Sequence, residues 1–188
     1  MKFSTRISLI ISAVVMLIVA TVLVFNSGLP NRAEFTGQFV ADEYVAPEVN
    51  SLAPPIQGIN ISNNVINTYQ LRGTPVIINF WATWCGPCRV EMPILQEVYD
   101  EFADDNLTVI AVNLGESHSM VQRWVQEQGL TYEILIDNER QIEMLYNLLA
   151  PPSTYIVDHE GVITDIFYGP VTADSLRQAI SQIILNNS

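Results

Sequence analysis

Asn79-Phe80-Trp81-Ala82-Thr83-Trp84-Cys85-Gly86-Pro87-Cys88 is the stretch that decides how this 188-residue chain folds. It holds the only two cysteines of the sequence, three positions apart, between an apolar run and a helical pattern. A pair of thiols in that place is typical of a disulfide that is made and broken during catalysis. Because residues i and i+3 face the same side of a helix, Cys85 and Cys88 can approach to the distance that a disulfide requires.

The residues between the cysteines suit the start of a helix. Gly86 is expected to permit a tight entry, and Pro87 loses nothing near the first helical position, because an N–H there has no intrahelical partner. At a helix N-terminus the free N–H groups and the positive end of the dipole favour a thiolate over a thiol. We therefore expect Cys85, nearer the exposed end, to be the attacking nucleophile and Cys88 to resolve the mixed disulfide.

Two other interpretations of the cysteine pair are weaker. A structural zinc site needs two more ligands, but the chain has no further cysteine, and its two histidines, His118 and His159, are not spaced as a pair. Inert core cysteines would not explain the Gly-Pro dipeptide between them or the tryptophans beside them. The sequence therefore predicts a redox disulfide, with no metal ion and no cofactor.

Strands and helices alternate after the cysteine segment as well as around it. Apolar runs predict buried strands, and apolar residues at helical spacing predict helices. Pro93 is expected to kink the first helix, Ser119 to begin a capping box at the second, and Thr172 to cap the last. The pattern predicts an α/β domain in which helices flank a mixed central sheet. The predicted strands are 76–81, 107–114, 132–136, 153–157 and 162–167, and the predicted helices are 85–104, 119–128, 140–149 and 172–185.

The N-terminal segment is predicted to be a transmembrane helix that anchors the chain. Residues 7–25 are uncharged and mostly apolar, a length that crosses a hydrocarbon core of about 30 Å. Lys2 and Arg6 precede this stretch, so the positive-inside bias places the N-terminus in the cytoplasm and the redox domain outside it. A cleaved signal peptide is the alternative, but the apolar stretch is long and no Ala-x-Ala-type site follows it. The predicted domains are an anchor at 1–28, an extracytoplasmic linker at 29–51 and a folded domain at 52–188.

The chain is acidic, with 20 Asp and Glu residues against 8 Lys and Arg and a formal net charge of −12 at pH 7. All of the acidic residues follow residue 28. A domain with this charge is a poor candidate for binding nucleic acid or an anionic lipid surface. We therefore predict no nucleic-acid partner.

The cysteine segment resembles the active-site segment of thioredoxin-like proteins. It is most similar to the membrane-anchored, extracytoplasmic branch of bacterial thiol-disulfide oxidoreductases of the ResA, TlpA and CcmG type. The resemblance implies a thioredoxin-like fold and thiol-disulfide oxidoreductase activity. It is carried by residues 79–88 with Arg89, Glu91, Met92 and Pro93, continues through 112–117, 152–158 and Gly161, and covers roughly residues 52–185.

The resemblance also implies roles for particular residues. Pro152 matches a cis-proline that packs against the disulfide and helps to form the substrate groove. Glu91 matches an acid that influences the proton chemistry of the pair. Asn79 stands where thioredoxin has a buried Asp, and because Asn cannot accept a proton, Glu91 becomes the candidate acceptor for the proton of Cys88; a solvated helix carboxylate is the alternative. The predicted substrate-contacting residues are Trp84, Gly86, Pro87, Pro151 and Pro152.

Pro151 departs from the family pattern. In relatives the residue at this position offers its backbone N–H to an extended substrate chain, and proline has none. Docking of a peptide by strand pairing is therefore expected to be weaker here.

By this resemblance, the expected function is the reduction of protein disulfides outside the bacterial cytoplasmic membrane, for example of apocytochrome c cysteines before haem attachment. The expected partners are a disulfide-containing protein substrate and a membrane or periplasmic thiol donor, with the membrane itself contacted through residues 7–25. An exported oxidant or isomerase is one alternative. A non-enzymatic copper chaperone is another, and Met92 is the only nearby candidate for a further ligand.

Overall fold

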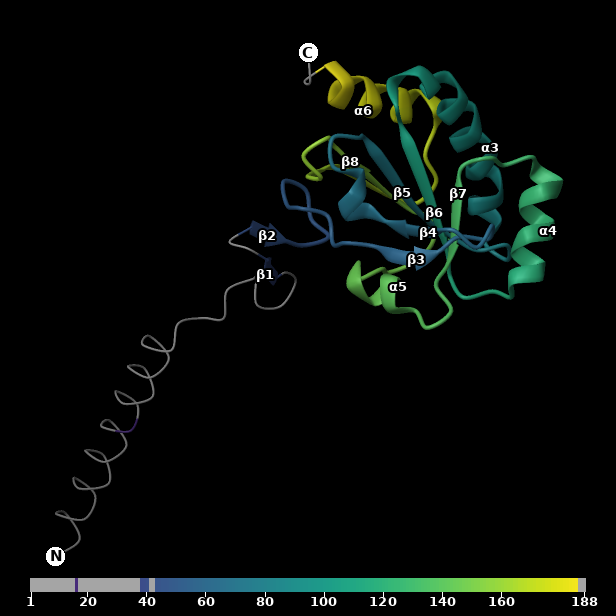
Figure 1. Ribbon diagram of the computed structural model, residues 1–188, viewed down its shortest axis with the longest axis horizontal. Helices are drawn as coiled ribbons and strands as arrows, with labels where there is room; N and C mark the ends of the chain where they lie inside the picture. Colours follow the sequence, from purple (N-terminus) through teal and green to yellow (C-terminus); the bar gives the residue numbers. More distant parts are fainter. Residues whose placement is uncertain (1–15, 17–37, 41–42, 186–188) are drawn as a thin grey trace, which may run out of the picture. The chain divides into compact units, whose positions relative to one another are not determined.

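A five-stranded mixed sheet forms the centre of the computed structural model, which describes residues 16, 38–40 and 43–185 (Figure 1). Its strands are β5 (Val76–Trp81), β6 (Thr108–Asn113), β7 (Glu133–Ile136), β8 (Ser153–Val157) and β9 (Ile163–Tyr168). They lie in the order β7-β6-β5-β8-β9, with β5, β6 and β7 parallel and β8 antiparallel to both β5 and β9. The predicted α/β fold with a mixed sheet is confirmed.

Helices cover both faces of the sheet. They are α3 (Gly86–Glu101), α4 (His118–Gln128), α5 (Gln141–Leu145) and α6 (Ala173–Leu185). The side chains of α3, α4 and α6 enter one hydrophobic cluster, and α5 contributes Ile142 to a second cluster on the opposite face. Because successive side chains of a strand point to opposite faces, the central strand β5 supplies Ile77 and Trp81 to the first cluster and Ile78 and Phe80 to the second.

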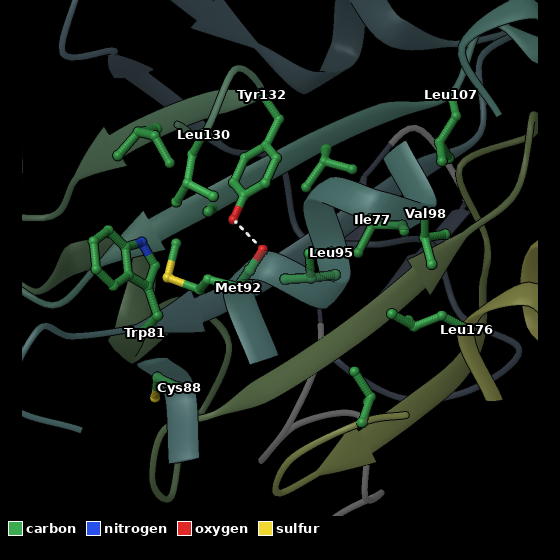
Figure 2. Packing of buried hydrophobic residues seen from close by; sticks show 14 of the residues in the cluster. Ile77, Trp81, Cys88, Met92, Leu95, Val98, Leu107, Leu130, Tyr132 and Leu176 are labelled. Carbon is green, nitrogen blue, oxygen red and sulfur yellow. Dashed lines mark hydrogen bonds between the residues drawn. The ribbon is translucent and has the colours of Figure 1, made fainter. Parts of the chain in front are cut away.

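The cluster beneath α3 holds the active-site helix against the sheet. Figure 2 shows Cys88, Met92 and Leu95 along the inner side of α3, with Met92 beside Trp81. All four side chains are fully buried, and burying a large apolar side chain contributes about 1.5–3 kcal/mol. The helix α3 runs without a break through Pro93, whose side chain is exposed.

Two helices begin or end elsewhere than the sequence predicted. Ser117 is the residue before α4, so Ser119 lies inside the helix and the predicted capping box is wrong. The helix predicted at 140–149 is only α5, because Asn147 takes a left-handed φ of 46° that ends the helical run. Asp137 fixes the start of α5, since its carboxylate accepts hydrogen bonds from the N–H groups of residues 141 and 143.

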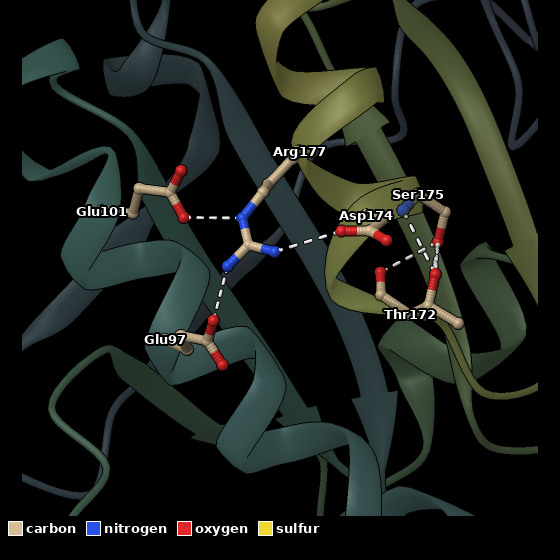
Figure 3. Close-up of polar contacts among 6 residues, drawn as sticks. All are labelled: Glu97, Glu101, Thr172, Asp174, Ser175 and Arg177. Atoms are coloured by element: carbon tan, nitrogen blue, oxygen red, sulfur yellow. Dashed lines mark hydrogen bonds and ion pairs between the residues drawn. The ribbon is translucent and has the colours of Figure 1, made fainter.

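Ion pairs join the last helix, α6, to α3. Figure 3 shows the Arg177 guanidinium among three carboxylates, those of Glu97 at 2.5 Å, Glu101 at 2.7 Å and Asp174 at 3.3 Å. Such surface pairs add little to stability, so they orient α6 more than they stabilise it. The predicted cap is confirmed, because the N–H of Ser175 donates to the Thr172 hydroxyl at 3.2 Å.

The chain before the sheet carries two short hairpins that the sequence did not predict. They are β1 (Gln38–Val40) with β2 (Glu43–Val45), and β3 (Gln57–Ile59) with β4 (Val65–Asn67). Between them, the segment that contains Asn50 and Ser51 runs along the edge strand β9. The N–H of Asn50 donates to the carbonyl of Ile163 at 2.8 Å, and the N–H of Ile163 donates to the carbonyl of Ser51 at 2.9 Å. The last residues of the linker predicted at 29–51 are thus bound to the folded domain by backbone hydrogen bonds, which leave no periodicity in the sequence.

The predicted anchor lies outside the described residues except for Met16. Among the residues that are described, no helix combines the length and the apolar character needed to cross a bilayer.

Candidate active site

Cys85 and Cys88 form a disulfide at the first turn of α3, with a Cα–Cα distance of 5.3 Å. Cys85 is the N-cap residue, and its Sγ accepts a hydrogen bond from the N–H of Cys88 at 3.2 Å. This places the Cys85 sulfur at the positive end of the helix dipole, where a negative charge is stabilised. Cys85 is 5% exposed and Cys88 is fully buried, so Cys85 is the more accessible residue of the pair.

The two residues between the cysteines are both exposed. Pro87 lies in the first turn of α3, as expected. The reason expected for Gly86 is wrong, because a Cβ built there would meet no atom within 4 Å and the residue does not need a positive φ. Gly86 therefore leaves the surface beside the disulfide open rather than permitting a tight turn.

Glu91 lies one turn after Cys88 on the same face of α3 and is only 1% exposed. Its Oε1 accepts hydrogen bonds from the Asn79 side-chain amide at 2.7 Å and from the Thr154 hydroxyl at 2.9 Å, and its Oε2 accepts one from the N–H of Val171 at 3.2 Å. The alternative that Glu91 is a solvated carboxylate is therefore wrong.

Asn79 serves this buried carboxylate as a donor. Its Nδ2 also donates to the Thr154 hydroxyl at 2.9 Å, while its Oδ1 is buried with no partner among the described residues. Thr154 was missed by the sequence analysis. It follows Pro152 by two positions, but nothing in its neighbourhood indicates that it faces α3.

The pKa of Glu91 is raised above its ordinary value of 4.5, mainly because burial penalises the charged form, while its three hydrogen bonds oppose this shift. A carboxyl group with a raised pKa in the folded state stabilises the fold most when it is protonated. Its contribution is full below pH 4.5 and is lost as the pH rises through the folded-state pKa.

We therefore expect Glu91→Gln to change how stability depends on pH. Relative to the variant, the native chain should lose free energy of unfolding as the pH rises above 4.5, by about 1.4 kcal/mol for each unit of pKa shift. Urea unfolding of both oxidised proteins from pH 4 to pH 8 measures this difference. A difference that stays constant with pH would contradict the raised pKa.

The turn before β8 brings Pro151 and Pro152 to the end of the sheet where the cysteines lie. The peptide bond between the two prolines is cis, as the resemblance implied for Pro152. Ser153 pairs with Phe80, the residue five positions before Cys85. Pro152 is buried, and its carbonyl accepts a hydrogen bond from the N–H of Gly169 at 2.9 Å.

Exposed apolar side chains lie on the segments next to the disulfide. Trp84, directly before Cys85, is 67% exposed, and Met120 at the start of α4 is 51% exposed. The turn before Pro152 and the strand beside it add two more, at 89% and 67% exposure. Val90 on α3 is the fifth, at 68% exposure. We call these five side chains the apolar collar; its members are Trp84, Val90, Met120, Leu149 and Tyr168.

Met92 is unavailable as a surface metal ligand, because it is fully buried against Trp81 (Figure 2). This removes the one additional ligand that the copper-chaperone hypothesis had near the cysteines.

Glu116 is a loop residue that the sequence suggested could approach the active site, and the structure places it there. It lies in the loop after β6, and its carboxylate accepts hydrogen bonds from both the N–H and the hydroxyl of Thr83, two positions before Cys85. The signal available in the sequence was its place in a loop that follows a parallel strand next to β5, at the sheet end where sites form.

The known proteins that this chain resembles include thiol-disulfide oxidoreductases, in agreement with a disulfide at the start of α3. The AhpC/TSA family matches residues 49–166. The chain is 32% identical over 141 residues to the thiol-disulfide oxidoreductase ResA of Geobacillus kaustophilus, covering 75% of this chain and 81% of that protein. It is 36% identical over 153 residues to the thioredoxin-like protein YneN of Bacillus subtilis, covering 78% and 89%.

Solved structures show the same fold. StoA from Bacillus subtilis matches with a TM-score of 0.61 and 26% identity over 69% of this chain and 98% of that one. A thiol:disulfide interchange protein of the DsbE type from Chlorobium tepidum matches with a TM-score of 0.68 and 24% identity, over 73% of this chain and 98% of that one.

Proposed function

We propose that this chain, which belongs to the AhpC/TSA family of thioredoxin-like proteins and is a thiol-disulfide oxidoreductase of the ResA type, reduces disulfides of proteins on the outer side of a bacterial cytoplasmic membrane. The observation that carries the proposal is the Cys85–Cys88 disulfide at the N-terminus of α3, in which Cys85 is the more accessible residue.

The reaction follows from that geometry. The Cys85 thiolate attacks one sulfur of a substrate disulfide, forms a mixed disulfide and releases one substrate thiolate. The Cys88 sulfur, already within bonding distance in the oxidised protein, then attacks Cys85, loses its proton and releases the second substrate thiolate. Two electrons pass to the substrate and the enzyme is left oxidised. A membrane or periplasmic thiol donor must then restore the dithiol.

The apolar collar supports a polypeptide substrate. Its exposed side chains come from segments at the end of the sheet that carries the disulfide and give an extended chain apolar surface to bury. Since Pro151 has no N–H to donate, side-chain burial replaces part of the backbone pairing on which relatives rely. The proposed substrate is a protein disulfide, with the cysteines of apocytochrome c as the example given by the resemblance.

Two parts of the proposal, the reducing direction and the location of the redox domain outside the cytoplasm, rest on separate features of the sequence. The Gly-Pro dipeptide between the cysteines resembles that of reducing members of the family. The apolar segment at 7–25, preceded by Lys2 and Arg6, supports a single-pass anchor with the redox domain outside the cytoplasm.

The reduction potential of the Cys85–Cys88 couple tests this proposal. We expect equilibration of the full chain with a glutathione or dithiothreitol redox buffer to give a value near that of thioredoxin, about −270 mV, or lower. A value approaching that of DsbA, about −120 mV, would identify an exported oxidant instead and would remove the apocytochrome assignment.

A further inference from the structure

The Glu116 carboxylate is the main side-chain anchor of the loop that leads from β5 to Cys85. Its Oε2 accepts hydrogen bonds from the N–H of Thr83 at 2.6 Å and from the side-chain amide of Asn113 at 2.7 Å, and its Oε1 accepts one from the Thr83 hydroxyl at 2.5 Å. Hydrogen bonds to a carboxylate are stronger than those between neutral groups. One side chain from the β6 loop therefore binds both polar groups that Thr83 can donate.

Glu116 is itself held in place by its own loop. Its N–H donates to the Oδ1 of Asn113 at 3.0 Å, and Asn113 is fully buried at the end of β6. Gly115 has a φ of +77°, and a Cβ there would come within 3.2 Å of the carbonyl oxygen of Asp137, so this tight backbone path needs glycine. The N–H of Leu114 donates to the carbonyl of Trp81 at 3.0 Å. Glu116 is thus fixed by hydrogen bonds within its own loop and by the hydrogen bond that joins this loop to the end of β5.

The residue after Thr83 is Trp84, the collar member next to the nucleophile. An exposed tryptophan whose backbone is already ordered docks a polypeptide at a lower entropic cost than one whose backbone docking must fix. Thr83 also touches the collar directly, because its hydroxyl lies 3.7 Å from the Sδ of Met120. We propose that Glu116 is a positioning residue that holds Thr83, and through it Trp84, in the conformation that docks a protein substrate. This rests on the proposed function for its substrate class.

Kinetics of insulin reduction, with dithiothreitol as the electron source, separate positioning from chemistry. Glu116→Ala should raise KM for insulin about tenfold, the factor that corresponds to ordering one additional residue on docking, and leave kcat within twofold. Glu116→Gln should keep KM near the native value, since the amide oxygen can accept from the Thr83 N–H and the amide nitrogen can donate to its hydroxyl. Glu127→Ala, which removes an exposed carboxylate at the other end of α4, is the matched control and should change neither constant.

Hydrogen exchange at the Thr83 amide gives a readout that needs no substrate. In the full chain, Glu116→Ala should speed this exchange at least about tenfold, because the bond to the carboxylate is lost, while Glu127→Ala leaves it unchanged. Thr83→Val removes only the hydroxyl bond, so it should raise KM by a smaller factor and serves if Glu116→Ala does not fold.

Each outcome decides one of the two proposals. Unchanged exchange and unchanged KM in Glu116→Ala would overturn the role of Glu116, as would an equal loss of kcat in Glu116→Ala and Glu116→Gln, which would assign the effect to charge. If the native chain does not reduce insulin but Glu116→Ala still frees the Thr83 amide, the proposed function is wrong and the anchoring by Glu116 stands.

Discussion

Cys85→Ser is expected to abolish the reduction of protein disulfides, whereas Cys88→Ser should stop the reaction after its first step. A serine hydroxyl at position 85 cannot form the mixed disulfide through which exchange proceeds. With Cys85 intact and Cys88 replaced, the N-cap sulfur still attacks the substrate. The second sulfur, carried by the residue whose Cα lies 5.3 Å from that of Cys85, is then missing and cannot release the substrate. The variant should therefore accumulate a covalent complex with its substrate.

Turnover of insulin and non-reducing electrophoresis measure the two effects. The Cys88→Ser adduct should be resolved by dithiothreitol, and mass spectrometry should place the bond at Cys85. The double variant is the matched control, since it keeps the fold and should form no adduct. Full activity in either single variant would contradict the proposed order of attack, and an adduct in Cys85→Ser alone would reverse the roles of the two sulfurs.

The parts of the fold that the sequence predicted are those set by local chemistry. The continuous apolar run 76–81 predicted a strand buried on both faces, and β5 is that strand at the centre of the sheet. Likewise, the spacing of Cys85 and Cys88 predicted a disulfide at a helix start, because i and i+3 geometry depends only on the helix itself.

The parts that the sequence did not predict depend on contacts between distant residues. Asn50 and Ser51 are held along β9 by backbone hydrogen bonds to Ile163, and backbone groups are the same in every sequence. The β3–β4 hairpin has strands of three residues, too short to show an alternation of apolar and polar positions.

The candidate site divides in the same way. Cys85, Cys88 and the cis bond before Pro152 were predicted by motif, but the burial of Glu91 was not. Position 91 lies three residues from Cys88 and so on the same face of α3, but the spacing does not say whether that face is buried at position 91. Its burial depends on Thr154, 63 residues away, which no local pattern could bring to the same place.

Glu91→Gln is expected to slow the second step of the reaction by about 100-fold, the lower end of what a positioned general base contributes. Cys88 is fully buried, so its thiol proton needs an acceptor within the protein when the sulfur attacks. Glu91 lies one turn further along α3 on the same buried face. Burial raises its pKa, which makes its carboxylate a stronger base than an exposed one. Glutamine has nearly the same shape but cannot take up the proton.

Single-turnover experiments with insulin, quenched with an alkylating reagent, measure how fast the mixed disulfide disappears at each pH. In the native chain this rate should fall as the pH drops through the raised pKa of Glu91, because the protonated acid cannot accept a second proton. The Gln variant should lose this inflection and keep the first step unchanged. Glu97→Gln, which removes a carboxylate that is 61% exposed on the same helix, is the matched control and should retain the native profile. A Gln variant with the native rate and the native inflection would show that Glu91 supports the fold and takes no proton from Cys88.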